Sequence, residues 1–582
     1  MCTVLRFILA FIVLIIVTAD PSVAAQPTPA FEPVRCPVPI PAFAVVDCGY
    51  VTVPERHEAP DGKQIRLAVA ILRATDPNKV SDPVLYLEGG PGGSAVWGLD
   101  AWVGHPITQQ RDLILLDQRG TGFSEPGLFC WNYEYPFDVD VVDLDVYERA
   151  CRDHLMRDGI DLGAYNSAQT ARDIPLVVRA LGLEQVNLYG ISYGTRVALT
   201  AMRDAPDVIR AVVLDSPYPP QVDGFELQAL YGYQQINALL ERCASDPQCG
   251  AAFPDLKARF YAFLDSDAGT YADVGDGYEE LTSATIVSVL FDTMYYSVAI
   301  PYIPMALDRM IAGDGTFFGE VAAGYIGPPT SGDEDDRLEE MVGLADDIAF
   351  AYSGFDDFDA YLDFLYEMDD AGRIELYRTA IDQAADDEYF DLIGLYLDAD
   401  TIEQAEAYMA SLSDEEYFRV IDGLVSVLAL GYTDVGDSDA AFNSVHCVEE
   451  IPFNSYEETE ALSVDLPQAV KDGLLEGVLG QFETCSYWGV TAAGPIETQP
   501  VQSAIPTLVL AGEFDPITPP VWALEAAVGL SAAQVVIIPG AGHSVIDSGE
   551  CAQSLGIAFL NNPTAALDTS CASNFTVPWV VR

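Results

Sequence analysis

The chain has 582 residues, and half of them are hydrophobic, which is enough apolar material for one large core or for several domains. It carries 90 Asp and Glu against 27 Lys and Arg, a formal net charge of −63. Phosphate backbones and anionic lipid head groups repel such a chain, so nucleic acid is not an expected partner. The acidity fits a solvated surface, and it equally fits attraction of cationic substrates.

The N-terminus is expected to be an export signal over residues 1–25. Arg6 precedes an apolar run over 7–19, and Ser22–Ala25 offers small residues for cleavage after Ala25. The run is shorter than the ~18–20 apolar residues of a membrane-spanning helix, so an uncleaved anchor is the alternative. We expect a secreted or periplasmic protein without stable membrane association. The sequence carries no signal for an oligomeric state.

Cysteine usage agrees with export, because removal of the signal with Cys2 leaves ten cysteines, an even number. They fall as neighbours along the chain: Cys36 and Cys48, Cys130 and Cys151, Cys243 and Cys249, Cys447 and Cys485, Cys551 and Cys571. None has the CxxC or Cys/His spacing of a metal site, so disulfides are expected, with no metal and no cofactor. Short loops favour pairing of neighbours, although connectivity does not follow from sequence.

Short apolar runs and amphipathic segments alternate through the first part of the chain, after a Pro-rich lead-in at 26–34. Strands are predicted at 45–53, 65–72, 83–87, 113–116, 186–189 and 209–214, and helices at 168–183 and 193–203. Buried strands separated by helices indicate an α/β fold with a mostly parallel, doubly wound sheet.

The pattern changes after about residue 220. Between residues 221 and 440 there are 47 Asp and Glu against 8 Lys and Arg, and the spacing of apolar residues becomes helical. Strands are predicted again at 506–511 and 534–538. We therefore expect a core formed by 26–220 and 446–582, interrupted by a large acidic helical cap over 221–445.

The motif Gly190-Ile-Ser192-Tyr-Gly194 matches G-x-S-x-G, the nucleophile turn of α/β hydrolases. A predicted strand precedes it and a predicted helix follows, which is the context that this turn requires. Glycines on either side relieve crowding at the strained turn, and the helix N-terminus favours developing negative charge. Ser192 is the predicted nucleophile.

A serine hydroxyl needs a base to remove its proton, and this fold orders its triad as Ser, acid, His. Of five histidines, His543 is the one in a loop just after a late predicted strand. Asp515, in the loop after the strand at 506–511, is predicted to orient the imidazole. Glu513 and Asp215 are rival acids, and Asp215 is interpreted as a loop or capping residue.

The oxyanion of an acyl-transfer reaction needs two N–H donors. The amide of Tyr193, directly after the nucleophile, is expected to supply one. Gly90, in the glycine loop 89–93, is expected to supply the other. This loop lacks the Lys-Ser/Thr of a P-loop and does not match GxGxxG, so nucleotide binding is not expected.

The segments GGPGGS, DQRGTGFS, GISYG, AGEFDPITP and PGAGHS together resemble the tripeptidyl-aminopeptidase and prolyl-iminopeptidase group of α/β hydrolases, and most closely its secreted tripeptidyl-aminopeptidase-like branch. The resemblance covers most of 35–220 and 445–575. It implies a serine peptidase that releases short peptides or single residues from a free N-terminus.

In this resemblance, Ser192, Asp515 and His543 occupy the family's triad positions, and the two predicted oxyanion donors occupy its oxyanion positions. Glu88 stands where prolyl iminopeptidases usually carry a histidine before GGPG, which argues against a strict proline iminopeptidase. The expected partners are peptides whose N-terminal ammonium one or two cap carboxylates would bind.

The same triad would serve a secreted carboxylesterase or lipase-like hydrolase, which is the alternative function because a fold does not fix a substrate. A non-catalytic binding protein does not account for an intact triad. A haloalkane or epoxide hydrolase would carry Asp where Ser192 stands.

Overall fold

The computed structural model describes residues 30–41, 44–133, 135, 144–266, 270–273, 278–324, 332–353, 355, 357–368, 370–397, 402–430 and 436–581. The expected export signal lies outside these residues. No helix within the described ranges combines the length and the apolarity needed to cross a membrane.

Nine strands of the described chain form one sheet in the order β1-β2-β3-β5-β4-β6-β7-β10-β11. Their bounds are β1 Phe31–Val34, β2 Val46–Pro54, β3 Gln64–Leu72, β4 Val84–Leu87, β5 Leu113–Leu116, β6 Val186–Ile191, β7 Ile209–Asp215, β10 Thr507–Gly512 and β11 Ala533–Ile538. The pairs from β1 to β5 are antiparallel, and those from β5 to β11 are parallel. The predicted mostly parallel α/β sheet is confirmed.

Strand β1 lies in the expected Pro-rich lead-in, where the sequence patterns give no strand. It is four residues long, is largely exposed and pairs with β2 alone. Pro33 fits there because an edge strand tolerates a residue without an N–H. The small hairpin of β8 (Thr270–Asp273) and β9 (Tyr278–Leu281) within the cap is also missed.

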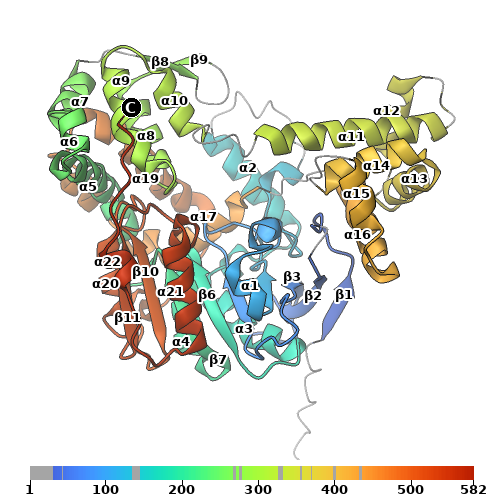
Figure 1. Cartoon of the computed structure of the whole chain (residues 1–582). Helices are drawn as coiled ribbons and strands as arrows, with labels where there is room; N and C mark the ends of the chain where they lie inside the picture. Colours follow the sequence, from blue (N-terminus) through green and yellow to red (C-terminus); the bar gives the residue numbers. More distant parts are fainter. Residues whose placement is uncertain are drawn as a thin grey trace, which may run out of the picture.

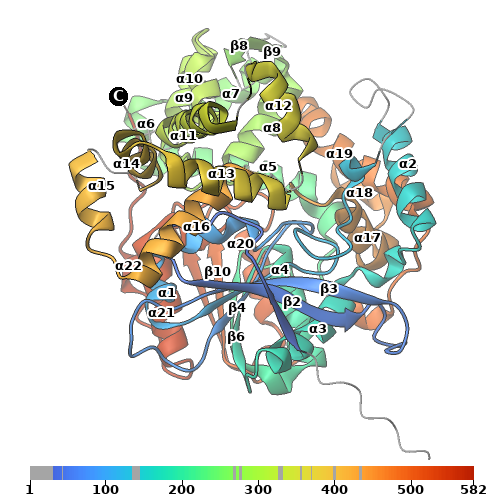
Figure 2. The same cartoon turned by 90° about the vertical axis from the view of Figure 1, so that its right-hand side faces the viewer.

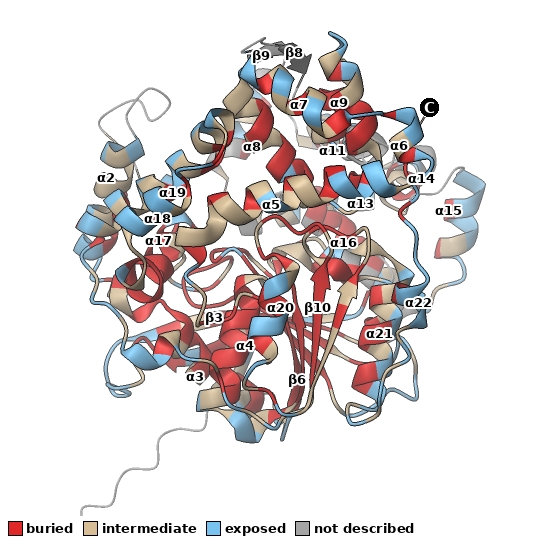
Figure 3. Cartoon of the chain, turned by 90° about the vertical axis from the view of Figure 1, so that its left-hand side faces the viewer, coloured by how far each residue is buried: buried red, intermediate tan, exposed pale blue. Residues whose placement is uncertain are grey.

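The central strands are buried on both faces because helices cover both sides of the sheet. Strands β4, β5, β6 and β10 are buried at every position, which explains their continuous apolar sequences. Helices α3 (Ser167–Ala180), α4 (Tyr193–Asp204) and α20 (Pro520–Ala527) cover one face, and α1 (Pro106–Gln110) and α21 (Glu550–Asn561) cover the other. Figure 3 shows the buried strands between helices with exposed outer faces.

Between β7 and β10, helices account for most of the described residues outside the hairpin of β8 and β9. Their bounds are α5 Gly224–Ser245, α6 Cys249–Ala252, α7 Leu256–Asp265, α8 Ser283–Thr293, α9 Ile303–Ile311, α10 Thr316–Ala322, α11 Gly332–Ser353, α12 Phe358–Glu367, α13 Asp370–Gln383, α14 Asp386–Tyr396, α15 Ile402–Met409, α16 Asp414–Leu430, α17 Asp439–Glu449, α18 Tyr456–Leu462 and α19 Gln468–Trp488. Two further helices are α2 (Leu144–Arg157) and α22 (Ser570–Ser573).

The helices above the sheet form two groups, α5–α10 on one side and α11–α16 on the other (Figure 1). Each group has its own hydrophobic cluster. In the turned view, α11, α13 and α16 lie above the sheet (Figure 2). The long insertion therefore forms a helical layer over one edge of the sheet, and this layer consists of the two groups side by side (Figure 1).

The expected cap boundary at residue 445 falls inside α17, and helices continue to Trp488. Helix α19 packs against α5 and α8 of the cap. The layer over the sheet thus includes α17 and α19. The sequence could not place this boundary, because a helix that covers a sheet and a helix that packs on a cap both bury one apolar face.

The ten cysteines form five disulfides between neighbours along the chain: Cys36–Cys48, Cys130–Cys151, Cys243–Cys249, Cys447–Cys485 and Cys551–Cys571. This is the pairing that short loops favour. Such bonds persist in oxidising compartments, which fits an extracellular protein. One of them, Cys447–Cys485, joins α17 to α19.

Candidate active site

Ser192 lies on the turn between β6 and α4, at the carboxyl edge of the sheet. Its φ of 52° and ψ of −122° fall in a strained region for a residue with a side chain. A Cβ at Gly190 would lie 2.5 Å from the carbonyl oxygen of Gly194, and one at Gly194 would lie 2.1 Å from that of Leu87. Both flanking positions therefore require glycine.

The glycine loop after β4 passes beside the serine. A Cβ at Gly89 would lie 3.0 Å from the Cβ of Ser192. Gly90 has a φ of 103°, and its amide donates to no group among the described residues. The amide of Tyr193 begins α4, where an N–H has no partner inside the helix. Both predicted oxyanion donors are thus left available next to the serine.

Asp117, in the motif after β5, holds the glycine loop in place. Its buried carboxylate accepts hydrogen bonds from Ser94 Oγ (2.9 Å), Val96 N (2.9 Å) and Phe123 N (2.8 Å). A Cβ at Gly122 would lie 2.1 Å from Asp117 Oδ2, so this glycine lets the turn close around the carboxylate. Burial raises the pKa of Asp117 to about 6, against the effect of the hydrogen bonds.

The segments AGEFDPITP, at the end of β10, and PGAGHS, directly after β11, bring an acid and a histidine together. His543 Nδ1 lies 2.9 Å from Asp515 Oδ2, and Asp515 is fully buried. The amides of Ile517 and Thr518 donate to Asp515 Oδ1, and the Thr518 hydroxyl donates to Oδ2 at 2.7 Å. Burial opposes protonation of His543, but the charge of Asp515 and its hydrogen bond outweigh it and raise the pKa of the imidazole above its usual value.

Among the described residues, Glu513, one of the rival acids, accepts a hydrogen bond from the backbone of the loop that leads to His543 and not from the imidazole. Its Oε2 accepts the N–H of Gly540 at 2.9 Å, and its Oε1 lies 3.5 Å from Nε of Arg242 in α5. The carboxylate therefore fixes the start of the loop, three residues before His543, and joins it to the cap.

Asp215, the other rival, is the last residue of β7 and is fully buried. Its carboxylate accepts hydrogen bonds from Val545 N (2.9 Å), Ile546 N (3.0 Å) and Tyr189 Oη (2.7 Å). The interpretation of Asp215 as a capping residue fits these contacts, because its carboxylate accepts the first two amides of the 3-10 helix Val545–Ser548 and so also holds the chain just after His543. Sequence alone does not reveal this contact between residues 330 positions apart.

A cavity of about 890 Å³ contains both Ser192 and His543. Its walls come from the glycine loop and from α2, α5, α8, α17 and α19. Apolar side chains include Phe225, Phe291, Phe442, Leu474 and Val478. Carboxylates include Glu88, Glu148, Asp292, Asp437 and Asp439. No Lys or Arg occurs among the described residues that line it, so the cavity favours a ligand with apolar and cationic parts.

His446 on α17 lines the same cavity, and sequence reasoning did not single it out. Its ring packs edge-on against Phe442 and Phe225, with centroids 4.3 Å and 4.8 Å away. Burial, and then the positive charge of Arg196, lowers the pKa of His446 to about 3. The imidazole is therefore neutral at pH 7 and belongs to the aromatic wall. In the sequence, His446 stands at helical spacing from neighbouring buried residues, as a side chain of the core would, so the pattern gives no sign of a cavity.

A buried charged cluster lies behind the nucleophile helix. Arg196, one turn after Ser192, donates to the carboxylate of Glu450 and to the carbonyl oxygens of Glu449 and Glu497, the carbonyls at 3.1 Å each. Burial raises the pKa of Glu450 to about 7, although Arg196 opposes the shift. The cluster joins α4, the helix that follows Ser192, to the end of α17, which forms part of the cavity wall.

Two family descriptions match separate parts of the chain. The description "alpha/beta hydrolase fold" matches residues 82–240, which include the glycine loop and the serine turn. The description "TAP-like protein" matches residues 476–571, which include Asp515 and His543. The first match thus includes the predicted nucleophile and the second the predicted acid and base, and most of the helical layer is unmatched.

Three curated proteins are similar to parts of the chain. A tripeptidyl aminopeptidase of Streptomyces lividans is 31% identical over 208 residues, 32% of this chain and 37% of that protein. The serine protease Hip1 of Mycobacterium tuberculosis is 28% identical over 241 residues, 38% of this chain and 45% of that protein. Carboxylesterase B of the same organism is 31% identical over 266 residues, 41% of this chain and 51% of that protein. The chain thus spans about half or less of the length of these relatives.

Proposed function

Because this chain is a tripeptidyl-aminopeptidase-like α/β hydrolase, we propose that it is an exported serine peptidase that removes single residues or short peptides from free N-termini. The observation that carries the proposal is the contact between His543 and Asp515 in a cavity that also contains Ser192. The helical layer over the cavity would exclude folded proteins and admit short peptides. The five disulfides support action outside the cytoplasm.

In the proposed reaction, His543 takes the proton of Ser192 as the hydroxyl oxygen attacks the scissile carbonyl carbon. The amides of Tyr193 and Gly90 donate to the oxyanion, and Asp515 stabilises the imidazolium. The imidazolium then protonates the leaving amine, and an acyl-enzyme remains. A water molecule, deprotonated by the same imidazole, hydrolyses the ester and releases the N-terminal fragment.

The carboxylates of the cavity support recognition of an N-terminal ammonium group. Glu88 and Asp437 border one turn of the glycine loop, because a Cβ at Gly93 would lie 2.8 Å from Glu88 Cγ and 3.5 Å from Asp437 Oδ1. An α-amine has a pKa of ~7.7–8.0 and is mostly protonated at pH 7. Charge-assisted hydrogen bonds from the ammonium to such carboxylates would hold the N-terminus near Ser192.

A carboxylesterase is the second candidate, and two observations favour it. The similarity to a carboxylesterase extends over more of the chain than the similarity to the aminopeptidase. The aromatic wall of Phe225, Phe442 and His446 would also accept the apolar part of an ester. An ester substrate would not need the carboxylates that line the cavity.

The two candidates are separated by one panel of substrates on the mature protein. The panel contains p-nitroanilides of one, two and three residues, each with a free and an acetylated N-terminus, and matched p-nitrophenyl esters. We expect acetylation to lower kcat/KM by at least ~10-fold, equivalent to ~1.4 kcal/mol, because it removes the ammonium charge. Equal rates on free and acetylated peptides, with faster rates on simple esters, would identify an esterase.

A further inference from the structure

The loop that carries His543 is held from the cap as well as from the sheet. The cap side is formed by residues 294–297, which directly follow α8. The carbonyl oxygen of Tyr295 accepts the N–H of His543 at 2.9 Å, and the Ser297 hydroxyl accepts the N–H of Gly542 at 3.0 Å. Two consecutive amides of the histidine loop therefore depend on acceptors from the cap.

The cap backbone approaches this loop so closely that only glycine fits between them. A Cβ at Gly542 would lie 2.1 Å from the carbonyl oxygen of Met294 and 2.7 Å from that of Tyr295. From the sheet side, a Cβ at Gly512 would lie 1.9 Å from the carbonyl oxygen of Gly542. The loop is thus enclosed between the cap and the strand that leads to Asp515.

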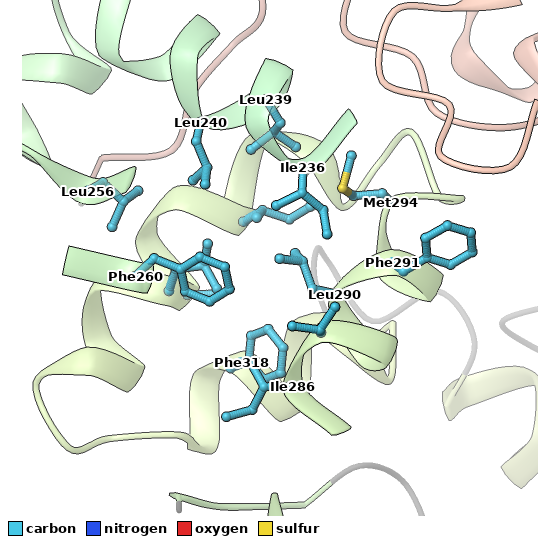
Figure 4. Close-up of a cluster of buried hydrophobic side chains, with 14 of the residues drawn as sticks. Ile236, Leu239, Leu240, Leu256, Phe260, Ile286, Leu290, Phe291, Met294 and Phe318 are labelled. Atoms are coloured by element: carbon cyan, nitrogen blue, oxygen red, sulfur yellow. The ribbon is translucent and has the colours of Figure 1, made fainter. Parts of the chain in front are cut away.

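Packing holds the start of the segment 294–297, at Met294 and Tyr295, whereas Tyr296 is exposed and Ser297 is half-buried. Met294 is fully buried in a cluster with side chains of α5, α7, α8 and α10, several of which Figure 4 shows around it. The ring of Tyr295 lies against the ring of His543, with centroids 5.0 Å apart. The acceptors that hold the histidine loop therefore belong to a packed helical unit.

The C-terminal residues 575–581 join the same two parts of the molecule a second time. Figure 1 shows the C-terminus beside the helices of the α5–α10 group, after the chain has left the sheet. The N–H of Val580 donates to the carbonyl oxygen of Pro301 at 3.0 Å, and the ring of Trp579 lies 6.4 Å from that of Phe514, the neighbour of Asp515. A swing of this group away from the sheet would break both connections.

We propose that Ser297 is a positioning residue for His543, and that the cap segment 294–297 is a fixed part of the catalytic framework. The α5–α10 half of the cap then stays seated on the histidine loop during turnover. This inference rests on the proposed role of His543 as general base. The physical reason is that the imidazole orients toward Asp515 only while its own backbone, and that of Gly542, keep their acceptors.

The test compares Ser297→Ala, which removes the acceptor, with Ser297→Thr, which keeps a hydroxyl. The matched control is Ser283→Ala, because the Ser283 hydroxyl at the other end of α8 donates to Leu264 O within the cap. We expect Ser297→Ala to lower kcat about 10-fold per titrated active site, with KM changed less than about 2-fold. Ser297→Thr should recover most of this loss, and Ser283→Ala should keep the wild-type kcat.

The pH profile distinguishes positioning from a general loss of folded enzyme. Asp515 raises the pKa of His543, so a looser pairing lowers that pKa. The acid limb of kcat/KM should therefore move to lower pH in Ser297→Ala alone. Unchanged kcat per site and an unchanged acid limb in Ser297→Ala would overturn the inference.

Hydrogen exchange tests the fixed cap directly, with no substrate involved. Peptides that cover 290–300 and 538–545 should exchange as slowly as those of strand β10. Faster exchange of both than of β10 would show that this half of the cap opens and would overturn the inference. Failure of the proposed function is a separate result: an esterase would be recognised in the wild-type enzyme by equal rates on free and acetylated peptides, and a protein without the proposed triad would not react with a fluorophosphonate at Ser192.

Discussion

His543 Nδ1 and Asp515 Oδ2 lie 2.9 Å apart, although the two residues come from loops that follow different strands. The strands are β10 and β11, which are parallel neighbours in the sheet. The carboxyl ends of such strands share one edge, so loops of similar length after them meet. The serine turn after β6 opens at the same edge.

The nucleophile is tested by covalent labelling. In the Ser192→Ala variant, a fluorophosphonate should no longer label the protein, and turnover should fall by on the order of 10⁶-fold, because triad residues act as a unit. Labelling is followed by gel fluorescence and intact mass, with Ser283→Ala as a serine control, because Ser283 lies outside the cavity lining and its hydroxyl donates to Leu264 O within the cap. Persistent labelling of Ser192→Ala would assign the nucleophile to another residue.

The acid is tested by a pair of isosteric variants. Asp515→Asn should leave the fold intact and lower kcat by ~10⁴-fold, because the imidazole loses the carboxylate that orients its tautomer. Asp215→Asn should act mainly on stability, by about 1–3 kcal/mol, because its buried carboxylate accepts hydrogen bonds from two backbone amides and from the hydroxyls of Tyr189 and Ser216. The measurements are kcat and urea unfolding of both variants. The opposite pattern would make Asp215 the orienting acid.

The pH dependence follows from the pairing of His543 with Asp515. The imidazole must be neutral to accept the serine proton, and its pKa lies above the usual value of 6.5. kcat/KM should therefore rise with pH through a midpoint above 6.5. For substrates with a free amine it should fall again as the ammonium deprotonates near pH ~8. The acetylated substrates provide the control, since their profile should lack the second limb.

Glu450 gives a prediction for stability. Its pKa in the folded protein is about 7, against 4.5 ordinarily, so the folded state holds a proton that the unfolded state has lost between these values. The free energy of unfolding should therefore fall as pH rises from about 4.5 to about 7. Glu450→Gln cannot titrate and should lack this contribution. The measurement is the difference in Tm between wild type and variant across that range, and a difference independent of pH would contradict it.

The titratable groups that face Glu450 set the limits of that experiment. They are Arg196, Glu449, Asp223 and the phenol of Tyr218. Removal of Arg196 would leave two carboxylates buried without a cation, and Arg196→Met should therefore cost about 3–5 kcal/mol of stability. Glu450→Gln is the milder probe, because Glu449 still pairs with the guanidinium.

The cysteines are tested by thiol titration of the mature protein, unfolded without reductant. We expect no free thiol, since all ten cysteines outside the export signal are paired. Peptide mapping should recover the five pairs of neighbours. Two or more free thiols per chain would refute this disulfide framework.

The sequence by itself determined the elements and the chemistry of the site. The parallel strands β4 to β7 and β10 were predictable because they are buried on both faces and are therefore short apolar runs, and the antiparallel strands β2 and β3 were predictable from their Val, Ile and Leu content. Ser192, Asp515 and His543 could be proposed as a triad because each lies in the turn or loop that follows a predicted strand, in the chain order Ser, acid, His. A helical insertion was evident from the loss of strand patterns and from its acidity.

Tertiary structure alone decided the relationships across the chain. In the folded protein, Asp215 accepts hydrogen bonds from the chain just after His543. His446 lines the cavity, and the Ser297 hydroxyl accepts the N–H of Gly542. The helices of the layer over the sheet also continue beyond residue 445, as far as Trp488. Local patterns report whether a side chain is buried, because burial sets the apolar period of a helix or strand. They do not report which distant segment buries it, because hydrophobic packing is not directional and the partner is fixed only when the whole chain has folded.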